Sequence, residues 1–122
     1  MQKTTFEINF GTSECSARTP YPAWAVPGCP LVVSRPIDHA HARETGKPRP
    51  STQRNAGWRI SHGGLGMAVS DCFDTRAAAY AFAVAVSDAP WDEIDTNPKT
   101  AAYRACKARW DAVKEVMLRR DR

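Results

Sequence analysis

The sequence has no run of about 18 consecutive apolar residues, so it predicts no membrane-spanning helix. Residues 1–7 contain no apolar core and include an acid, which is not typical of a secretion signal. No C-x-x-C pair occurs among the four cysteines, so the zinc and redox motifs built on that pair are not predicted. In a chain without an export signal we expect the cysteines to be reduced thiols, and these are Cys15, Cys29, Cys72 and Cys106.

What the sequence does contain is the composition of a globular protein, with 43% hydrophobic and 25% charged residues. A length of 122 residues predicts a single domain, spanning residues 1–122. The net charge of +4 is unevenly distributed. Residues 35–56 hold five bases and two acids, residues 88–98 hold four acids and no base, and residues 99–122 hold eight bases and three acids. Such a distribution favours an anionic partner near the basic segments.

The clearest structural pattern lies in residues 58–87, and it predicts a ββα unit. Short alternating runs at 58–62 and 67–73 flank a glycine-rich link, as in a β-hairpin. Thr75 then stands where a helix N-cap is expected. The bulky residues of 76–87 alternate as in a strand, but the alanines between them favour a helix because alanine has the highest helix propensity.

Weaker patterns complete the predicted fold. Phe6, Ile8 and Phe10 alternate with polar residues as in a half-buried strand, and residues 31–33 predict another short strand. Residues 14–21 lack periodicity, and no strand is predicted there.

An apolar stripe near the C-terminus, at spacings of 3, 4, 3 and 4, predicts a helix over about residues 98–119 with Asn97 as its N-cap. The stripe consists of Tyr103, Cys106, Trp110, Val113 and Met117. The expected fold is therefore α+β, with a small, mainly antiparallel sheet covered by two C-terminal helices.

Residues 35–56 show no periodicity, and their prolines, glycine and charges predict a long basic loop. Loops of this length inside a compact domain are usually either functional or disordered. The sequence leaves flexibility and partner contact open as alternatives.

His62 is the first candidate for a general base, with Asp71, Asp74 and Cys72 as the nearest possible partners in sequence. Nothing in their spacing requires catalysis, and a histidine that donates to a turn carbonyl is the preferred interpretation. Cys72 and Cys106 fall on apolar stripes, where burial would raise a thiol pKa and disfavour a nucleophilic role. We therefore expect no catalytic residues and no enzymatic activity.

Two motifs suggest ligands but have simpler explanations. His39 and His41 alternate on a segment expected to be extended and could hold zinc or copper, but no cysteine lies nearby and a solvated loop is preferred. The glycine-rich link at 63–66 lacks the Lys-Ser/Thr of a phosphate-binding P-loop and leads into a strand, so its glycines are better explained by a turn. No metal and no cofactor are expected.

The basic segments could meet a nucleic-acid backbone, although the terminal helix mixes both signs of charge as a solvated surface does. The residues predicted to contact a partner are Arg35, Arg43, Lys47, Arg49, Arg54, Arg59, Arg104, Lys107 and Lys114.

One further pattern joins Trp58-x-Ile60-Ser61-His62, a glycine turn, Ala68-Val69, Thr75-Arg76-x-Ala78 and the later Trp91. It covers about 35 residues and resembles a pattern of small accessory proteins of phages and plasmids, among which anti-CRISPR proteins are a prominent class. The resemblance implies a compact, non-enzymatic protein that binds a host or element-encoded protein complex in the cytoplasm of a bacterial cell.

The leading hypothesis from the sequence is therefore a protein-binding inhibitor or modulator of a host macromolecular complex, most specifically a CRISPR–Cas effector complex. The alternative is a nucleic-acid-binding accessory or regulatory protein that uses the basic loop and the terminal helix. The oligomeric state is not predicted.

Overall fold

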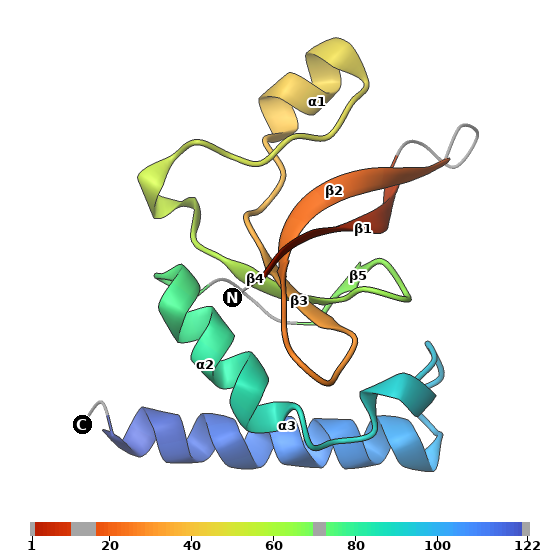
Figure 1. Ribbon diagram of the computed structural model, residues 1–122, viewed down its shortest axis with the longest axis vertical. Coiled ribbons are helices and arrows are strands. Elements are labelled where there is room, and N and C mark those ends of the chain that lie inside the picture. Colours follow the sequence, from red (N-terminus) through yellow and green to blue (C-terminus); the bar gives the residue numbers. More distant parts are fainter. Residues whose placement is uncertain (1, 11–16, 70–72, 121–122) are drawn as a thin grey trace.

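The computed structural model describes residues 2–10, 17–69 and 73–120, and it has an α+β fold (Figure 1). A five-stranded antiparallel sheet has the strand order β1-β2-β3-β4-β5, so each strand pairs with its neighbours in the chain. The strands are β1 (Gln2–Phe10), β2 (Ala17–Ala25), β3 (Leu31–Ser34), β4 (Arg59–His62) and β5 (Met67–Ala68). The helices are α1 (His39–Thr45), α2 (Arg76–Val86) and α3 (Ala101–Arg120), with short 3₁₀ turns η1 (Arg54–Ala56) and η2 (Trp91–Glu93).

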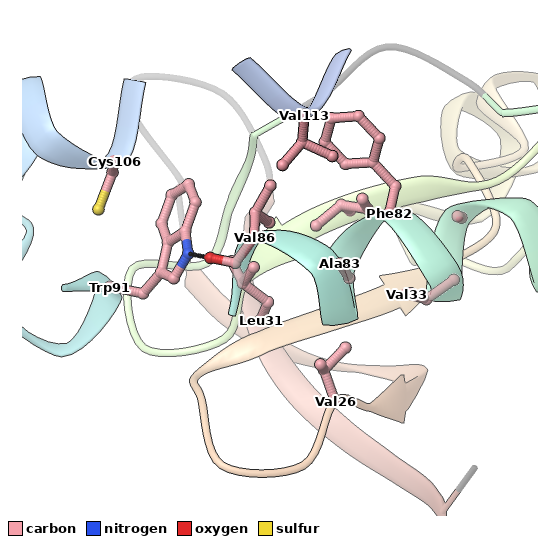
Figure 2. Close-up of a cluster of buried hydrophobic side chains, with 11 residues drawn as sticks. Val26, Leu31, Val33, Phe82, Ala83, Val86, Trp91, Cys106 and Val113 are labelled. Atoms are coloured by element: carbon pink, nitrogen blue, oxygen red, sulfur yellow. Dashed lines mark hydrogen bonds between the residues drawn. The ribbon is translucent and has the colours of Figure 1, made fainter. Parts of the chain in front are cut away.

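The larger core lies where α2 and α3 cover one face of the sheet, which confirms the predicted fold class (Figure 1). Leu31 and Val33 of β3 point into this core and are fully buried. Figure 2 shows Val86 of α2 beside Trp91 of η2, whose indole Nε1 donates to the Val86 carbonyl at 2.8 Å. From the predicted apolar face of α3, Cys106 and Val113 are buried in this core.

A second, smaller core lies on the opposite face of the sheet. Successive side chains of a strand point to opposite faces, so Val32 points away from the core that holds Leu31 and Val33. It joins Val32 to Phe6 and Ile8 of β1 and to Tyr21 and Ala23 of β2. Every residue of β3 is therefore buried, on one face or the other.

The ββα unit predicted at residues 58–87 is present, formed by β4, β5 and α2. An isolated bridge between Trp58 and Phe73 extends the pairing of β4 and β5, while residues 70–72 lie outside the described parts of the chain. Thr75 caps α2 as expected, and its Oγ1 accepts from the Ala78 amide at 3.0 Å.

The prediction that left residues 14–21 without a strand was wrong from residue 17 onward, because β2 pairs with β1 along all of its nine residues. Pro20 and Pro22 sit within this strand, opposite Glu7 and Thr5. Proline is tolerated where its missing N–H would face no neighbouring strand. In β2 only Trp24 and Ala25 pair with β3, so the segment with the prolines has a free second side in the part of the sheet described.

The start of the last helix also differs from the prediction. Asn97 Oδ1 accepts from the Lys99 amide at 2.9 Å, which closes a turn before the helix and does not cap it. The helix begins at Ala101, and Thr100 Oγ1 accepts from the Tyr103 amide at 3.2 Å in the manner of an N-cap. A threonine three residues downstream competed for the same role, and the sequence pattern did not separate the two.

Residues 35–57, which we call the flap, form an ordered excursion between β3 and β4 and not a structureless loop. The flap contains α1, a helix of seven residues that the sequence pattern does not predict, and Asp38 caps this helix by accepting from the His41 amide at 3.1 Å. Gly46 ends α1 with φ +71°, the left-handed conformation that glycine adopts without strain. His39 and His41 are consequently helical, and the extended segment expected for them was wrong.

Candidate functional site

Two predicted contact residues hold the flap in place. The Arg35 side chain donates from Nε to the Ser51 carbonyl at 3.1 Å and from Nη2 to the Gln53 carbonyl. Arg49 forms an ion pair with Asp38 at 3.1 Å, and its own carbonyl accepts from the Asp38 amide at 2.9 Å. These bonds join the two ends of the flap, so both guanidinium groups serve the structure before any partner arrives.

Three other predicted contact residues of the flap are free to meet a partner. Arg43 of α1, Lys47 and Arg54 of η1 are exposed, and their charged ends have no hydrogen-bond or ion-pair partner within the described residues. The flap therefore presents positive charge on a segment whose backbone is already ordered.

At the base of the flap, two tryptophans and two arginines from four separate segments stack on one another. The Arg76 guanidinium carbon lies 4.3 Å from the centroid of the Trp24 ring and 5.8 Å from that of Trp58. The Arg35 guanidinium carbon lies 5.2 Å from the centroid of Trp58. We call the set Trp24, Arg76, Trp58 and Arg35 the ladder. Each contact falls within the range over which a cation is attracted by an aromatic ring.

Arg76 is the residue of this site that sequence reasoning missed. It is the first residue of α2, and it lies outside the basic segments that predict partner contact. Its two aromatic partners lie in β2 and next to β4, far from it in the sequence, so only the folded chain shows the contact.

Beneath the ladder, Tyr21 belongs to the smaller core and is only 2% exposed. Its hydroxyl donates to the Arg35 carbonyl at 2.8 Å. Burial raises the pKa of Tyr21 to about 12, although the charges of Arg35 and Arg59 act in the opposite direction. Arg59, another predicted contact residue, is half-buried, and its Nε has no hydrogen-bond partner in the described chain.

The bases of α3 do not join this site. Figure 1 shows α1 and α3 at opposite ends of the molecule, with the sheet between them. Lys107 is paired with Asp111 at 3.1 Å, while Arg104 and Lys114 are exposed. The basic loop and the terminal helix, which the charge pattern predicts to bind a partner together, are therefore separate.

His62 uses both ring nitrogens within the fold. Nδ1 accepts from the Leu65 amide at 3.1 Å, so the proton is on Nε2, which donates to the Trp91 carbonyl at 2.7 Å. The ring thereby ties the β4–β5 turn to η2. The role is structural, but the ring accepts from the turn and donates to η2, whereas the sequence predicted donation to a carbonyl of the turn. Of its possible catalytic partners, Asp74 is exposed, and Asp71 and Cys72 lie outside the described residues.

The two cysteines in the described part of the chain are free thiols. Burial raises the pKa of the Cys106 thiol, and the charge of Glu93 adds to this effect. Burial also raises the pKa of Cys29. A raised pKa lowers the thiolate fraction near neutral pH, so neither sulfur is activated as a nucleophile.

A cavity of about 220 Å³ opens beside α3. Its lining is mostly apolar and comprises Val69, Trp91, Ile94, Tyr103, Cys106, Lys107, Trp110 and Asp111.

Within residues 2–10, 17–69 and 73–120, no three histidine, cysteine or acidic side chains gather as metal ligands would. No helix in the same ranges is long and apolar enough to span a membrane.

Comparison of the chain with family models, curated proteins and solved structures finds no match.

Proposed function

We propose that this protein binds nucleic acid through the flap and the ladder, as an accessory or regulatory protein without a catalytic step. The supporting observation is that three exposed cations of the flap have no hydrogen-bond or ion-pair partner within the described residues. Arg43, Lys47 and Arg54 belong to the flap, and Arg35 connects the flap to the ladder that holds Arg76. Unpaired cations on an ordered segment are what a phosphate backbone requires, because affinity comes largely from neutralising phosphates and releasing counterions.

The test is a salt titration with two variants of equal net charge. Charge reversal of the flap (R43E/K47E/R54E) is compared with the same reversal on α3 (R104E/K107E/K114E), using fluorescence anisotropy of labelled single-stranded and duplex oligonucleotides. We expect the wild-type log affinity to fall linearly with log salt. The flap variant should lose most of the affinity and show a shallower slope, by about 0.9 for each duplex phosphate contact removed.

The α3 variant should keep more of the affinity, because its charges lie at the other end of the molecule. Circular dichroism of both variants controls for folding. Equal losses in the two variants would show that only net charge matters, and an absence of salt-dependent binding by the wild-type protein would refute the proposal.

The hypothesis of a protein-binding inhibitor, with a CRISPR–Cas effector complex as its most specific form, stays a prediction. One observation favours a protein partner: the cavity beside α3 is walled by Trp91, Tyr103 and Trp110, and aromatic pockets of this kind hold the central side chains of protein interfaces. A stoichiometric protein complex recovered from nuclease-treated host lysate, and lost with Tyr103→Arg at the cavity wall, would support this second function. Recovery of an empty eluate would remove it.

A further inference from the structure

We propose that Arg76 is a preorganised phosphate clamp, in which the ladder fixes the guanidinium plane and leaves its N–H groups for a phosphate of the bound nucleic acid. This inference rests on the proposed function and names the residue and the chemical group at its centre. It concerns a residue that lies outside the set of bases predicted from the sequence.

Two indole rings lie within cation–π distance of this guanidinium. Arg76 lies 4.3 Å from the Trp24 ring centroid and 5.8 Å from the Trp58 ring centroid, so two indoles restrain one planar group. A guanidinium that stacks through its face keeps its five N–H donors in the plane, directed away from the rings. In residues 2–10, 17–69 and 73–120, no carboxylate or carbonyl accepts from these donors.

Arg35 shows what the same arrangement looks like when the donors are used. It also stacks on Trp58, at 5.2 Å, but its Nε and Nη2 donate to the carbonyls of Ser51 and Gln53. The two arginines of the ladder thus differ in one respect. Backbone carbonyls accept from the Arg35 side chain, whereas no group within the described residues accepts from the Arg76 side chain.

The surroundings of Arg76 favour an anion over a neutral ligand. It is the first residue of α2, where the positive end of the helix dipole lies, and no acid occurs in the first turn. Lys3 lies opposite Trp24 in the β1–β2 register and is exposed. Asp74 lies two residues before Arg76 and is exposed to solvent. A planar fork of donors matches a phosphate in two parallel hydrogen bonds, which a lysine cannot form.

The ladder also reduces the entropic loss on binding. An arginine side chain normally loses rotamer freedom when it contacts a ligand, and that loss weakens affinity. The stacked guanidinium has already lost much of this freedom in the free protein. A conservative change to lysine should therefore weaken binding although the charge is kept.

The experiment compares R76K and R76A with R18K, a matched change at an exposed arginine that is paired with Glu7 elsewhere on the sheet. The probe is a labelled single-stranded DNA oligonucleotide, measured over a range of salt concentrations. We expect R76K to weaken binding roughly tenfold, as for loss of one charge-assisted hydrogen bond, with the salt slope unchanged. R76A should also lower the slope by about 1, and R18K should change neither quantity.

If Arg76 had a purely structural role, R76K and R76A would lower the melting temperature. They would not then show the predicted difference, in which R76K weakens binding at an unchanged salt slope and R76A also lowers the slope. Wild-type binding that R76K leaves intact would overturn the clamp while the proposed function stands. An acidic polyglutamate peptide that binds wild-type protein more tightly than the oligonucleotide at equal salt would also overturn it.

If no oligonucleotide binds, the proposed function fails, and the clamp is then tested with inorganic phosphate alone. Titration of wild-type protein should shift the indole N–H resonances of Trp24 and Trp58, which are the rings that hold Arg76. Unshifted indole resonances would overturn the clamp, and this measurement does not depend on whether a variant folds.

Discussion

Replacing Gly66 by alanine tests how the sheet closes over its smaller core. Gly66 lies in the β4–β5 turn, has φ +68°, and donates from its amide to the His62 carbonyl at 2.8 Å. A Cβ at this position would stand 2.4 Å from the Glu7 carbonyl oxygen and 3.4 Å from the Ile8 Cα. The turn therefore contacts the β1 backbone at Glu7 and Ile8. Ile8 belongs to the smaller core, and Glu7 lies between Ile8 and Phe6, which belongs to it as well.

The expected loss has two parts, and Gly46→Ala isolates the first. Gly46 has φ +71° and nothing within 4 Å of its added Cβ, so it meets only the cost of a left-handed alanine. That cost is roughly 1–2 kcal/mol, offset by about 0.4–1 kcal/mol from the smaller freedom of the unfolded chain. We therefore expect Gly46→Ala to lower the free energy of unfolding by roughly 0–1.6 kcal/mol.

Gly66→Ala adds a steric part. Contacts of a real Cβ essentially never fall below 3.0 Å, so the turn or β1 must move by at least the remaining 0.6 Å, and both partners are backbone. Overpacking of this kind costs roughly 1–3 kcal/mol. The total for Gly66→Ala is then roughly 1–5 kcal/mol, which is to be compared with the roughly 5–15 kcal/mol that typically stabilises a domain.

Urea denaturation of the wild-type protein and the two variants measures these values, with equal m-values as the control for two-state behaviour. We expect the midpoint to fall in the order wild type, Gly46→Ala, Gly66→Ala. If the two variants have the same midpoint, the β4–β5 turn does not press on β1, and the closure of the smaller core described above is wrong.

Three further predictions concern side-chain hydrogen bonds. Because the pKa of Tyr21 is raised to about 12, the contribution of the protonated Tyr21 to the stability of the fold is complete below pH 10 and is lost as pH rises through 12, by up to about 3 kcal/mol. The stability of Tyr21→Phe should therefore depend less on pH above pH 10 than that of the wild-type protein, and parallel profiles would contradict this. The amide of His41 and the Arg49 side chain lower the pKa of Asp38, so the contribution of Asp38 to stability is present above its ordinary pKa and is lost as pH falls through the lowered one. Asp38→Asn should keep the α1 cap and Asp38→Ala should not. Amide hydrogen exchange in α1 measures the difference, and equal exchange in the two variants would count against the cap. His62→Phe leaves the buried Trp91 carbonyl and the half-buried Leu65 amide unpaired, and it should cost about 2–5 kcal/mol in urea denaturation. A loss below about 1 kcal/mol would show that the ring does not tie the turn to η2.

The parts of the fold that the sequence predicts are those in which local pattern and tertiary packing agree. Thr75 caps α2 because its position and the following alanines favour the same structure. The apolar stripe of α3 is buried where it was expected, as Cys106 and Val113 show. In both helices the information lies within a few neighbouring residues.

The missed elements depend on contacts between distant residues. β2 contains Pro20 and Pro22, which argue against a strand locally, and it forms because β1 pairs with it along its whole length. The short α1 has no apolar periodicity, and it is ordered by the Ile37–Pro50 bridge and by the Arg49–Asp38 pair at its base. The pairing of β2 and the contacts at the base of α1 could not be inferred from a window of neighbouring residues, although the two ends of α1, Asp38 and Gly46, are local signals.

The candidate site shows the same division more sharply, because a count of bases does not reveal which of them remain free. Arg35 and Arg49 contribute to the positive charge of residues 35–56, yet the fold uses their donors to close the flap. Arg76 stands outside that segment, yet it meets Trp24 and Trp58 in space and retains its donors. A binding surface is defined by charge that the folded chain leaves unsatisfied, and such charge becomes visible only after the internal hydrogen bonds have been assigned. This distinction is why charge reversal on the flap and on α3, with equal net charge, should have unequal effects.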